Sequence, residues 1–527
     1  AGQTQEEIVR KAEAEGKGYK AAVEQMYYGN QQFLFVYEQF DDVRLVAAPP
    51  SSIGKFGGDT DNWIWPRHTG DFSMFRVYAS KDNRPAAYSP QNVPYRPKKH
   101  FSISTKGVKE GDFTMIYGFP GNTQEYILSD AVAYIAERSD PAKIAIRTGR
   151  LDIITKAQES DPALRIHYAA KHASIANAWK KWQGEALGID RRGTVAAKFD
   201  YETQFGLWSV GRPEYAGVVM GLRVEYDRIM DAYFAYEITR ETLSTLPAAY
   251  TPEERAEECF ARRKFAEQAL WRHAFREYGR CPKVYRTPSY AEGMARYKSP
   301  EAYADALFEA VWEGSDSVAM QPAVRLREET KRMLDHISWM LGTKSLRNLN
   351  SKILNELYTT YIKGLREWDR ERAFYPDANL TLRVAYGSVA GYEYADGEYH
   401  KPQTTLDGII AKDNPEIYDY DIPQSLRDLY ASKNYGRWGT VIDGRRTVPV
   451  CFLATNHTTG GNSGSPVLNA GGELIGINFD RTWRSTMSDI AFDPAICRNI
   501  AVDIRYVLFV VDRVGGAGYL LKEMTLK

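Results

Sequence analysis

Short apolar runs alternate with turn residues in the first part of the chain. Four such runs lie at residues 33–37, 43–48, 74–78 and 113–117, and Gly, Pro and Asp separate them. Their β-branched and aromatic content is typical of strands. The turn-rich string GFPGNT follows the last run at residues 118–123. The pattern therefore predicts a β region at this end of the chain.

Residues 128–379 have a helical pattern instead, because they are rich in Ala, Leu, Glu, Lys and Arg and contain few turn clusters. Five positions recur there at steps of four and three, which places them on one helix face. They are Tyr168, His172, Ile175, Trp179 and Trp182. Such a stripe is more typical of a helix core than of a cofactor site. We expect a helical domain inserted into a β-rich chain.

The last part of the chain returns to β-like runs, at residues 380–385, 448–454 and 474–478. Residues 501–513 have the pattern of a closing amphipathic helix that ends before Gly515 and Gly516. We therefore expect domains over residues 1–127, 128–379 and 380–527. The length of 527 residues agrees with this number, at roughly 150 residues per domain.

Composition excludes several classes of protein. Lys plus Arg and Asp plus Glu both number 68, so the net charge is zero, and no overall attraction to nucleic acid is expected. The apolar stretch at residues 507–511 is too short to span a bilayer. The four cysteines form no CxxC pair and are too few for a disulfide scaffold, and their pairing is not deducible.

The most informative motif is GNSGSP at residues 461–466, which lies between two β runs. Small residues flank Ser463, so a tight turn can expose its hydroxyl and aim the backbone N–H groups of Gly461 and Ser463 at one point. That arrangement is what an oxyanion hole requires. A glycine-rich hairpin with an ordinary serine is the alternative. The longer string resembles the nucleophile loop of chymotrypsin-like serine peptidases.

A second long motif, GGDTDNWIWPRHTGDFSMFRVYA, covers residues 57–79. Asp71 directly precedes the β run in it, which is a natural place for a buried carboxylate that orients a histidine. With GNSGSP and the later INFDR string at residues 477–481, this motif resembles the dipeptidyl peptidase 7 and 11 family of bacterial serine exopeptidases. The resemblance covers essentially the whole chain.

The resemblance implies a mixed β and α fold. The implied fold is a chymotrypsin-like double β-barrel, with barrels over residues 1–127 and 380–527 and a helical cap over residues 128–379. It implies that Ser463 is the nucleophile and Asp71 the triad carboxylate. It also implies oligopeptide substrates with a free amino end, a periplasmic location, a signal peptide in the precursor and a homodimer. No metal or organic cofactor is needed for this chemistry.

The catalytic histidine departs from the family pattern. The family carries it well upstream of the Asn-Trp string, whereas the only histidine before Asp71 here is His68, three residues away. His457 is close to Ser463 but lies on the wrong side of the family's chain order, and we expect it to hydrogen-bond locally. The opening sequence reads as part of a domain already begun. We therefore expect the base in a segment upstream of the given chain.

Recognition of the substrate's amino end is assigned by the resemblance to four residues: Asn62, Trp63, Asn177 and Asp480. Asp480 lies 17 residues after Ser463, and a carboxylate there can bind an ammonium group. Asn177 lies on the face of its helix opposite the apolar stripe, so it does not belong to the packed core. A turn-forming or solvated residue is the alternative for each position.

Arg481 follows the amine-binding Asp480, and in the family this position lies in the primary specificity pocket. Arginine there accompanies cleavage after Asp or Glu, while glycine accompanies cleavage after bulky apolar residues. The physics agrees, because a guanidinium offers a bidentate partner to a carboxylate. The alternative is a surface arginine paired with an acid such as Asp489.

The sequence therefore predicts a serine dipeptidyl aminopeptidase that prefers Asp or Glu as the second residue. Two alternatives stay open: the same fold with an apolar preference, and a catalytically silent peptide-binding relative. A metallopeptidase is disfavoured because the chain has no HExxH motif and its eight histidines are scattered. A nucleotide-binding protein is disfavoured because no P-loop or GxGxxG string occurs.

Overall fold

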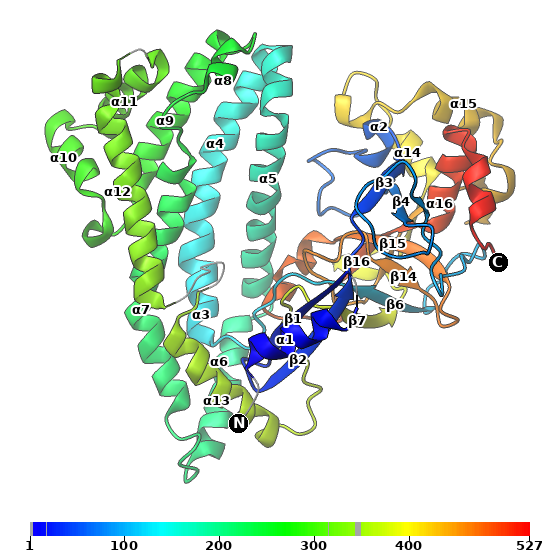
Figure 1. Ribbon diagram of the computed structural model, residues 1–527, viewed down its shortest axis with the longest axis horizontal. Coiled ribbons are helices and arrows are strands. Elements are labelled where there is room, and N and C mark those ends of the chain that lie inside the picture. The colour runs from blue at the N-terminus through cyan, green and yellow to red at the C-terminus, as the bar shows by residue number, and fades with distance from the viewer. Residues whose placement is uncertain (1–3, 17, 315, 343–348) are drawn as a thin grey trace. The chain divides into compact units, whose positions relative to one another are not determined.

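The computed structural model describes residues 4–16, 18–314, 316–342 and 349–527 (Figure 1). The chain divides into two compact units. One unit is built from two separate stretches, Ala1–Tyr126 and Phe374–Lys527, and is rich in strands. The other is continuous, Ile127–Ala373, and is helical. A helical insertion between two β-rich segments is therefore what the structure has.

A seven-stranded antiparallel sheet forms the centre of the β-rich unit (Figure 1). Its strand order is β10-β13-β16-β15-β14-β6-β7. The strands are β6 (Phe113–Gly118), β7 (Arg383–Ser388), β10 (Gln403–Thr405), β13 (Pro449–Ala454), β14 (Pro466–Leu468), β15 (Leu474–Arg481) and β16 (Asn499–Asp503). Strand β6 belongs to the first β region of the sequence, yet it pairs with β14 and β7 from the last region. One sheet therefore joins the two ends of the chain.

Four smaller antiparallel sheets complete the strands of this unit. They contain β1 (Tyr19–Met26) with β2 (Gln31–Glu38), β3 (Asp42–Ala47) with β4 (Met74–Ala79) and β5 (Val93–Pro94), β8 (Tyr392–Ala395) with β9 (Glu398–His400), and β11 (Thr440–Ile442) with β12 (Arg445–Thr447). Every sheet in the described residues has two outer strands, so none of them closes into a barrel. The mixed β and α fold holds, whereas the sheets differ from the closed barrels expected from the resemblance.

One hydrophobic core joins the early and late segments of the β-rich unit. Trp65 and Phe72 from the first segment pack in the same buried cluster as Val450, Val502 and Tyr506 from the last. Because Trp65 and Phe72 flank residues 66–71, their burial fixes both ends of that loop. Helices of this unit are α1 (Gln5–Ala14), α2 (Ser51–Gly54), α14 (Leu406–Lys412), α15 (Gln424–Ser432) and α16 (Ile504–Phe509).

The C-terminal region differs in part from the sequence-based expectation. Residues 501–503 belong to strand β16, and the helix α16 begins only at Ile504. All residues of β16 are buried, so the apolar pattern there serves a central strand and not an amphipathic helix. A short apolar run without flanking turn residues does not distinguish these two structures.

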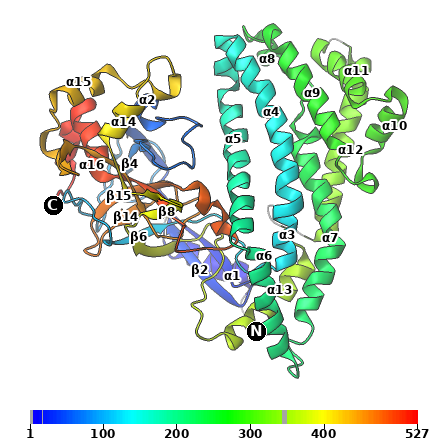
Figure 2. The same cartoon turned by 180° about the vertical axis from the view of Figure 1, so that it is seen from behind.

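The helical unit contains α3 (Ser129–Tyr134), α4 (Asp140–Ser160), α5 (Pro162–Arg191), α6 (Thr194–Ser209), α7 (Val218–Glu241), α8 (Pro252–Ala256), α9 (Lys264–Tyr278), α10 (Pro288–Tyr297), α11 (Pro300–Glu313), α12 (Ser317–Leu341) and α13 (Lys352–Trp368). Helices α4 and α5 run side by side (Figures 1 and 2). Asp161 alone separates them and caps α5, because its side chain accepts from the Ala163 N–H at 2.7 Å, and Pro162 is the first residue of α5.

The stripe of five residues predicted on one helix face lies on α5. Tyr168 and Ile175 are buried in a cluster with Ile154 of α4 and Leu270 of α9. These two residues are therefore core, as expected, whereas His172, Trp179 and Trp182 are half-buried. No helix of the described residues has both the length and the apolarity that a membrane crossing needs. All four cysteines are buried and free.

Candidate functional site

The GNSGSP loop connects β13 to β14 and holds Ser463 at the surface. Ser463 is exposed, while Asn462 and Ser465 beside it are buried. Gly461 has a φ of 106°, and a Cβ at this position would overlap the Phe119 carbonyl oxygen. Only glycine fits this combination of positive φ and close backbone approach. The small residues around Ser463 therefore make the turn that presents its hydroxyl.

The hydroxyl of Ser463 donates to the backbone carbonyl of Phe479 at 3.2 Å. Among the described residues, the N–H groups of Gly461 and Ser463 donate to no protein acceptor. Both groups lie in the same exposed turn. Two backbone donors thus lie in the same turn as the hydroxyl, and their role as the oxyanion hole stays a prediction.

Asp480 lies next to Phe479 on β15 and is the centre of a buried polar cluster. Its Oδ2 accepts from Arg67 Nη1 at 2.6 Å and from the Trp63 N–H at 3.3 Å. Its Oδ1 accepts from the Arg481 N–H at 2.8 Å. A carboxylate has about four acceptor positions, so Asp480 keeps capacity for one more donor, such as an ammonium group.

Arg67 was not foreseen from the sequence, although it lies within the second motif. Its side chain is only 9% exposed, and its guanidinium carbon lies 5.2 Å from the centre of the Phe479 ring. Arg67 Nε also donates to Thr69 Oγ1 at 3.0 Å. The only signal for Arg67 in the sequence was its position between the predicted amine-binding residues and Asp71.

Asp71 lies before β4 in the loop that Trp65 and Phe72 anchor. Solvent reaches this residue, so the buried carboxylate expected from the sequence is wrong. The surrounding protein nevertheless desolvates the carboxyl group and raises its pKa, Arg67 lowers the pKa, and Asp480 raises it again. The carboxyl groups of Asp71 and Asp480 are therefore close enough to interact. The positive charge of Arg67 acts against the repulsion between them.

Neither histidine near the motifs contacts Ser463 or Asp71. His68 is buried against Gly408, and burial together with the charge of Lys412 lowers its pKa to about 3. His457 donates from Nε2 to the Ser488 carbonyl at 3.1 Å and stacks on Phe492 at 4.4 Å between ring centres. Within the described residues, no imidazole hydrogen-bonds the Ser463 hydroxyl. His457 thus hydrogen-bonds locally, as the sequence predicts, and His68 is packed away from the surface.

Arg481 is buried and points to an acidic partner within the protein. It makes a bidentate pair with Asp489, at 2.6 Å from Nη1 and 2.8 Å from Nη2. Nη1 also donates to Ser488 Oγ at 2.8 Å. The pairing with Asp489 that the sequence left as an alternative is present. The surface position in that alternative is wrong, because Arg481 is only 4% exposed.

The remaining predicted site residues fall in both units. Asn62 and Trp63 are half-buried in the loop beside Asp480. Trp63 has a φ of 65°, an uncommon conformation for a residue with a side chain. Asn177 is exposed on α5 of the helical unit. The structure thus brings together Asn62, Trp63, Asp71, Ser463, Asp480 and Arg481 in the β-rich unit.

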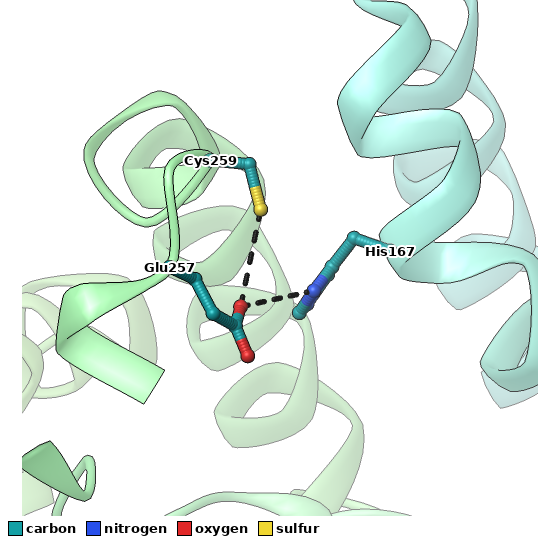
Figure 3. A group of neighbouring side chains, drawn as sticks. All are labelled: His167, Glu257 and Cys259. Atoms are coloured by element: carbon teal, nitrogen blue, oxygen red, sulfur yellow. Dashed lines mark hydrogen bonds and ion pairs between the residues drawn. The ribbon is translucent and has the colours of Figure 1, made fainter. Parts of the chain in front are cut away.

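One group of side chains in the helical unit has the composition of a metal site. Glu257 lies between His167 and Cys259 (Figure 3), and its Oε2 is 3.3 Å from His167 Nδ1. Arg263 Nη1, however, is 2.7 Å from His167 Nε2 and 3.2 Å from Glu257 Oε2. The guanidinium already supplies the positive charge there, and a metal ion would have to displace it. These residues do not fit a metal site.

A cavity of about 610 Å³ also lies in the helical unit, among α5, α6 and the π-helical turn Ile135–Ser139. Apolar side chains and the carboxylates of Glu137, Asp190 and Asp200 line it. None of the predicted site residues does. The residues that the motifs predict therefore lie in and around the polar cluster of Asp480, and not at this cavity.

Comparisons with known proteins identify the family of this chain. A sequence model of the peptidase S46 family matches residues 1–264 and 253–526. The Asp/Glu-specific dipeptidyl-peptidase of Capnocytophaga gingivalis is 43% identical over 551 residues, which cover 96% of this chain and 76% of that protein. The dipeptidyl-peptidase 7 of Phocaeicola vulgatus is 34% identical over 563 residues, which cover 99% and 77%.

A solved structure has the same fold. The crystal structure of Porphyromonas endodontalis DPP11 in complex with the dipeptide Arg-Glu matches with a TM-score of 0.85 and 34% sequence identity. The match covers 99% of this chain and 80% of that one.

Proposed function

Since the chain belongs to the peptidase S46 family, we propose that it is a serine dipeptidyl peptidase that releases dipeptides from the free amino end of peptides. It prefers Asp or Glu as the second residue. The observation that carries this proposal is the sequence of contacts along β15: Phe479 accepts from Ser463, Asp480 is the candidate amine anchor, and Arg481 is the candidate pocket residue.

Ser463 attacks the carbonyl carbon of the peptide bond after the second residue. The hydroxyl proton passes to a general base, and the negative charge that develops on the carbonyl oxygen is stabilised by the N–H groups of Gly461 and Ser463. The exposure of Ser463 and the unused donors of both N–H groups support these roles. A metal ion or organic cofactor has no role in this chemistry.

The general base is a histidine that Asp71 orients. His68 and His457 are held in packed positions with lowered pKa values, so neither of them is assigned this role. The exposure of Asp71 supports its part in this step, because an exposed carboxyl group is accessible to such a partner.

The amino end of the substrate binds at the loop of Asn62 and Trp63 together with Asp480. Burial strengthens the interaction between a carboxylate and an ammonium group, and the side chain of Asp480 is 8% exposed. Asn177 of the helical unit supplies a further contact in this proposal. Binding of the amine beside Ser463 fixes the distance to the cleaved bond, so the enzyme removes two residues at a time.

Arg481 selects an acidic second residue, and Asp489 holds it in place. The bidentate pair fixes the plane of the guanidinium, and in this proposal the acidic side chain of the substrate pairs with the guanidinium held in that plane. Greater identity to the Asp/Glu-specific relative than to the dipeptidyl-peptidase 7 cited above supports this choice. In DPP11 of P. endodontalis the bound dipeptide Arg-Glu also carries an acidic second residue.

A catalytically silent peptide-binding protein is the second candidate. It is favoured by one observation, namely that no imidazole within the described residues contacts Ser463. Hydrolysis of an unblocked dipeptidyl reporter by the full-length protein distinguishes the two. We expect hydrolysis of the free-amine reporter and at most slow hydrolysis of its N-acetylated form. Binding of the reporter without turnover would instead identify a silent relative.

The location and assembly of the protein are part of the same proposal. On the grounds of family resemblance, we assign the protein to the periplasm and to a homodimer. Sedimentation of the full-length protein tests the dimer, and fractionation of cells tests the location. A monomeric protein at micromolar concentration would contradict the first assignment, and activity confined to the cytoplasmic fraction would contradict the second.

A further inference from the structure

A lysine bridges the two ends of the proposed amine-binding loop, residues 61–66. Lys412, the last residue of α14, donates from Nζ to Asp61 Oδ2 at 2.8 Å and to the Pro66 carbonyl at 3.0 Å. Asp61 precedes Asn62 and Trp63, and Pro66 follows them. One ammonium group therefore closes the segment that carries two of the proposed amine-end contacts.

Asp61, the acid that pairs with Lys412, has a second hydrogen-bond donor. Tyr420 donates from its hydroxyl to the other oxygen of Asp61 at 3.0 Å. Burial, and after it this contact with the Asp61 carboxylate, raises the pKa of Tyr420 to about 12. The side chains of Asp61 and Lys412 are 8% and 27% exposed. A charge pair that is shielded in this way is stronger than one at the surface.

The loop has a reason to need this support. Trp63 has a φ of 65°, a left-handed conformation that a residue with a side chain adopts only at a cost in free energy. Its N–H group donates to Asp480 at 3.3 Å. If the loop relaxed, the Trp63 N–H would move away from Asp480, and the substrate amine would meet a different arrangement of Asn62 and Asp480.

We propose that Lys412 is a positioning residue of the amine-end subsite. It touches no substrate atom and acts through Asp61 and Pro66, which hold the loop of Asn62 and Trp63 against Asp480. This inference rests on the proposed function, because it takes the cluster around Asp480 as the place where the substrate amine binds. It requires binding of a dipeptide but not its hydrolysis.

The test measures binding of the free dipeptide Leu-Asp to the full-length protein by calorimetry, so that it does not depend on turnover. Replacing Lys412 with Met keeps the aliphatic stem and removes the two donated bonds. We expect Lys412→Met to raise Kd about tenfold, which corresponds to about 1.4 kcal/mol. The matched control is Lys401→Met, because Lys401 pairs only with Asp443 at the surface, where both side chains are more than 70% exposed.

A double-mutant cycle separates positioning from general destabilisation. In an Asp480→Ala background the amine anchor is already absent, so Lys412→Met should change Kd less than twofold. An equal change in both backgrounds, or no change in either, would overturn the proposal. Tyr420→Phe removes one hydrogen bond to Asp61 with little change of shape, and should raise Kd two- to threefold even if Lys412→Met fails to fold.

The outcomes also separate this inference from the proposed function. If the unmutated protein binds Leu-Asp but does not hydrolyse unblocked reporters, the peptidase proposal fails and the role of Lys412 is still decided by the cycle. If the unmutated protein does not bind Leu-Asp at millimolar concentration, the subsite is misplaced and both proposals fall. If hydrolysis occurs and the cycle is additive, only the role of Lys412 is rejected.

Discussion

Arg67 and Asp480 form an ion pair at 2.6 Å in which both side chains are less than 10% exposed. The two residues come from opposite sides of the helical insertion in sequence, and the pair joins the two motifs in one site. Arg67 also lowers the pKa of Asp71, while Asp480 raises it. The charge of one arginine therefore acts on both carboxylates that the proposed mechanism uses.

Removing either member of this pair should have distinct effects. Arg67→Met leaves a buried carboxylate without its cation, and loss of one partner of a buried pair costs about 3–5 kcal/mol of stability. Asp480→Ala should raise KM at least tenfold and lower kcat, because a misplaced amine end also misaligns the cleaved bond. Denaturant unfolding and steady-state kinetics measure the two effects.

The double variant Arg67→Met with Asp480→Asn provides the control for charge. It should recover most of the lost stability, because no unpaired charge stays buried, but it should not recover KM. Recovery of both would mean that Asp480 does not bind the substrate amine through its charge.

Ser463→Ala should abolish hydrolysis and leave the fold intact. Ser463 is exposed and its hydroxyl makes one hydrogen bond, to the Phe479 carbonyl, so the change in unfolding free energy should stay within about 0.5 kcal/mol. Turnover should fall by several orders of magnitude. Mass spectrometry of the unmutated protein treated with a serine-directed phosphonate should place the label on Ser463, and a label elsewhere would remove this residue as nucleophile.

Arg481→Gly should reduce the preference for acidic substrates. Since Asp489 then loses its bidentate cation next to the pocket, cleavage after Asp or Glu should fall by about 100-fold or more relative to cleavage after Leu. Asp489→Asn tests the companion role, because it leaves one acceptor for Arg481 and removes the competing charge. It should lower KM for acidic substrates. Unchanged ratios of kcat/KM in both variants would place Arg481 outside the pocket.

The stability of the β-rich unit should fall as the pH is lowered through the histidine range. Burial and the charge of Arg481 lower the pKa of His457 to about 4 in the folded protein, while an unfolded histidine has a pKa of about 6.5. Above pH 6.5 His457 is neutral in both states. Below it only the unfolded state takes up the proton, so folding loses about 1.4 kcal/mol per pH unit down to about pH 4.

His457→Gln should flatten this dependence between pH 6.5 and 4.5 relative to the unmutated protein. The control is His100→Gln, since His100 is an exposed residue of the same unit. Urea unfolding at several pH values, followed by fluorescence, gives the slopes. Parallel slopes for the unmutated protein and His457→Gln would show that His457 titrates equally in both states.

The sequence allowed good predictions where a local pattern decides the structure. The strand before Gly118, the long helix with Tyr168 and Ile175, and the turn of Ser463 all follow from periodicity or from small residues. These features depend on neighbours in the chain, which a single sequence displays.

Features that depend on distant partners were missed. The pairing of β6 with β14 and β7 joins residues on both sides of the helical insertion, and no local signal indicates it. Arg67 gained its role from Asp480, more than 400 positions later. The burial expected for Asp71 was also wrong. Burial depends on which distant segments of the chain pack against a residue, and the strand that follows Asp71 does not indicate those segments.

The most direct measurement is the specificity constant of the full-length protein on two unblocked reporters, one with Asp and one with Leu before the cleaved bond and the same apolar first residue. The proposed pairing of a substrate carboxylate with Arg481 predicts a kcat/KM at least 100-fold higher for the Asp reporter. A higher value for the Leu reporter would contradict the acidic pocket, and hydrolysis of neither reporter would contradict the peptidase itself.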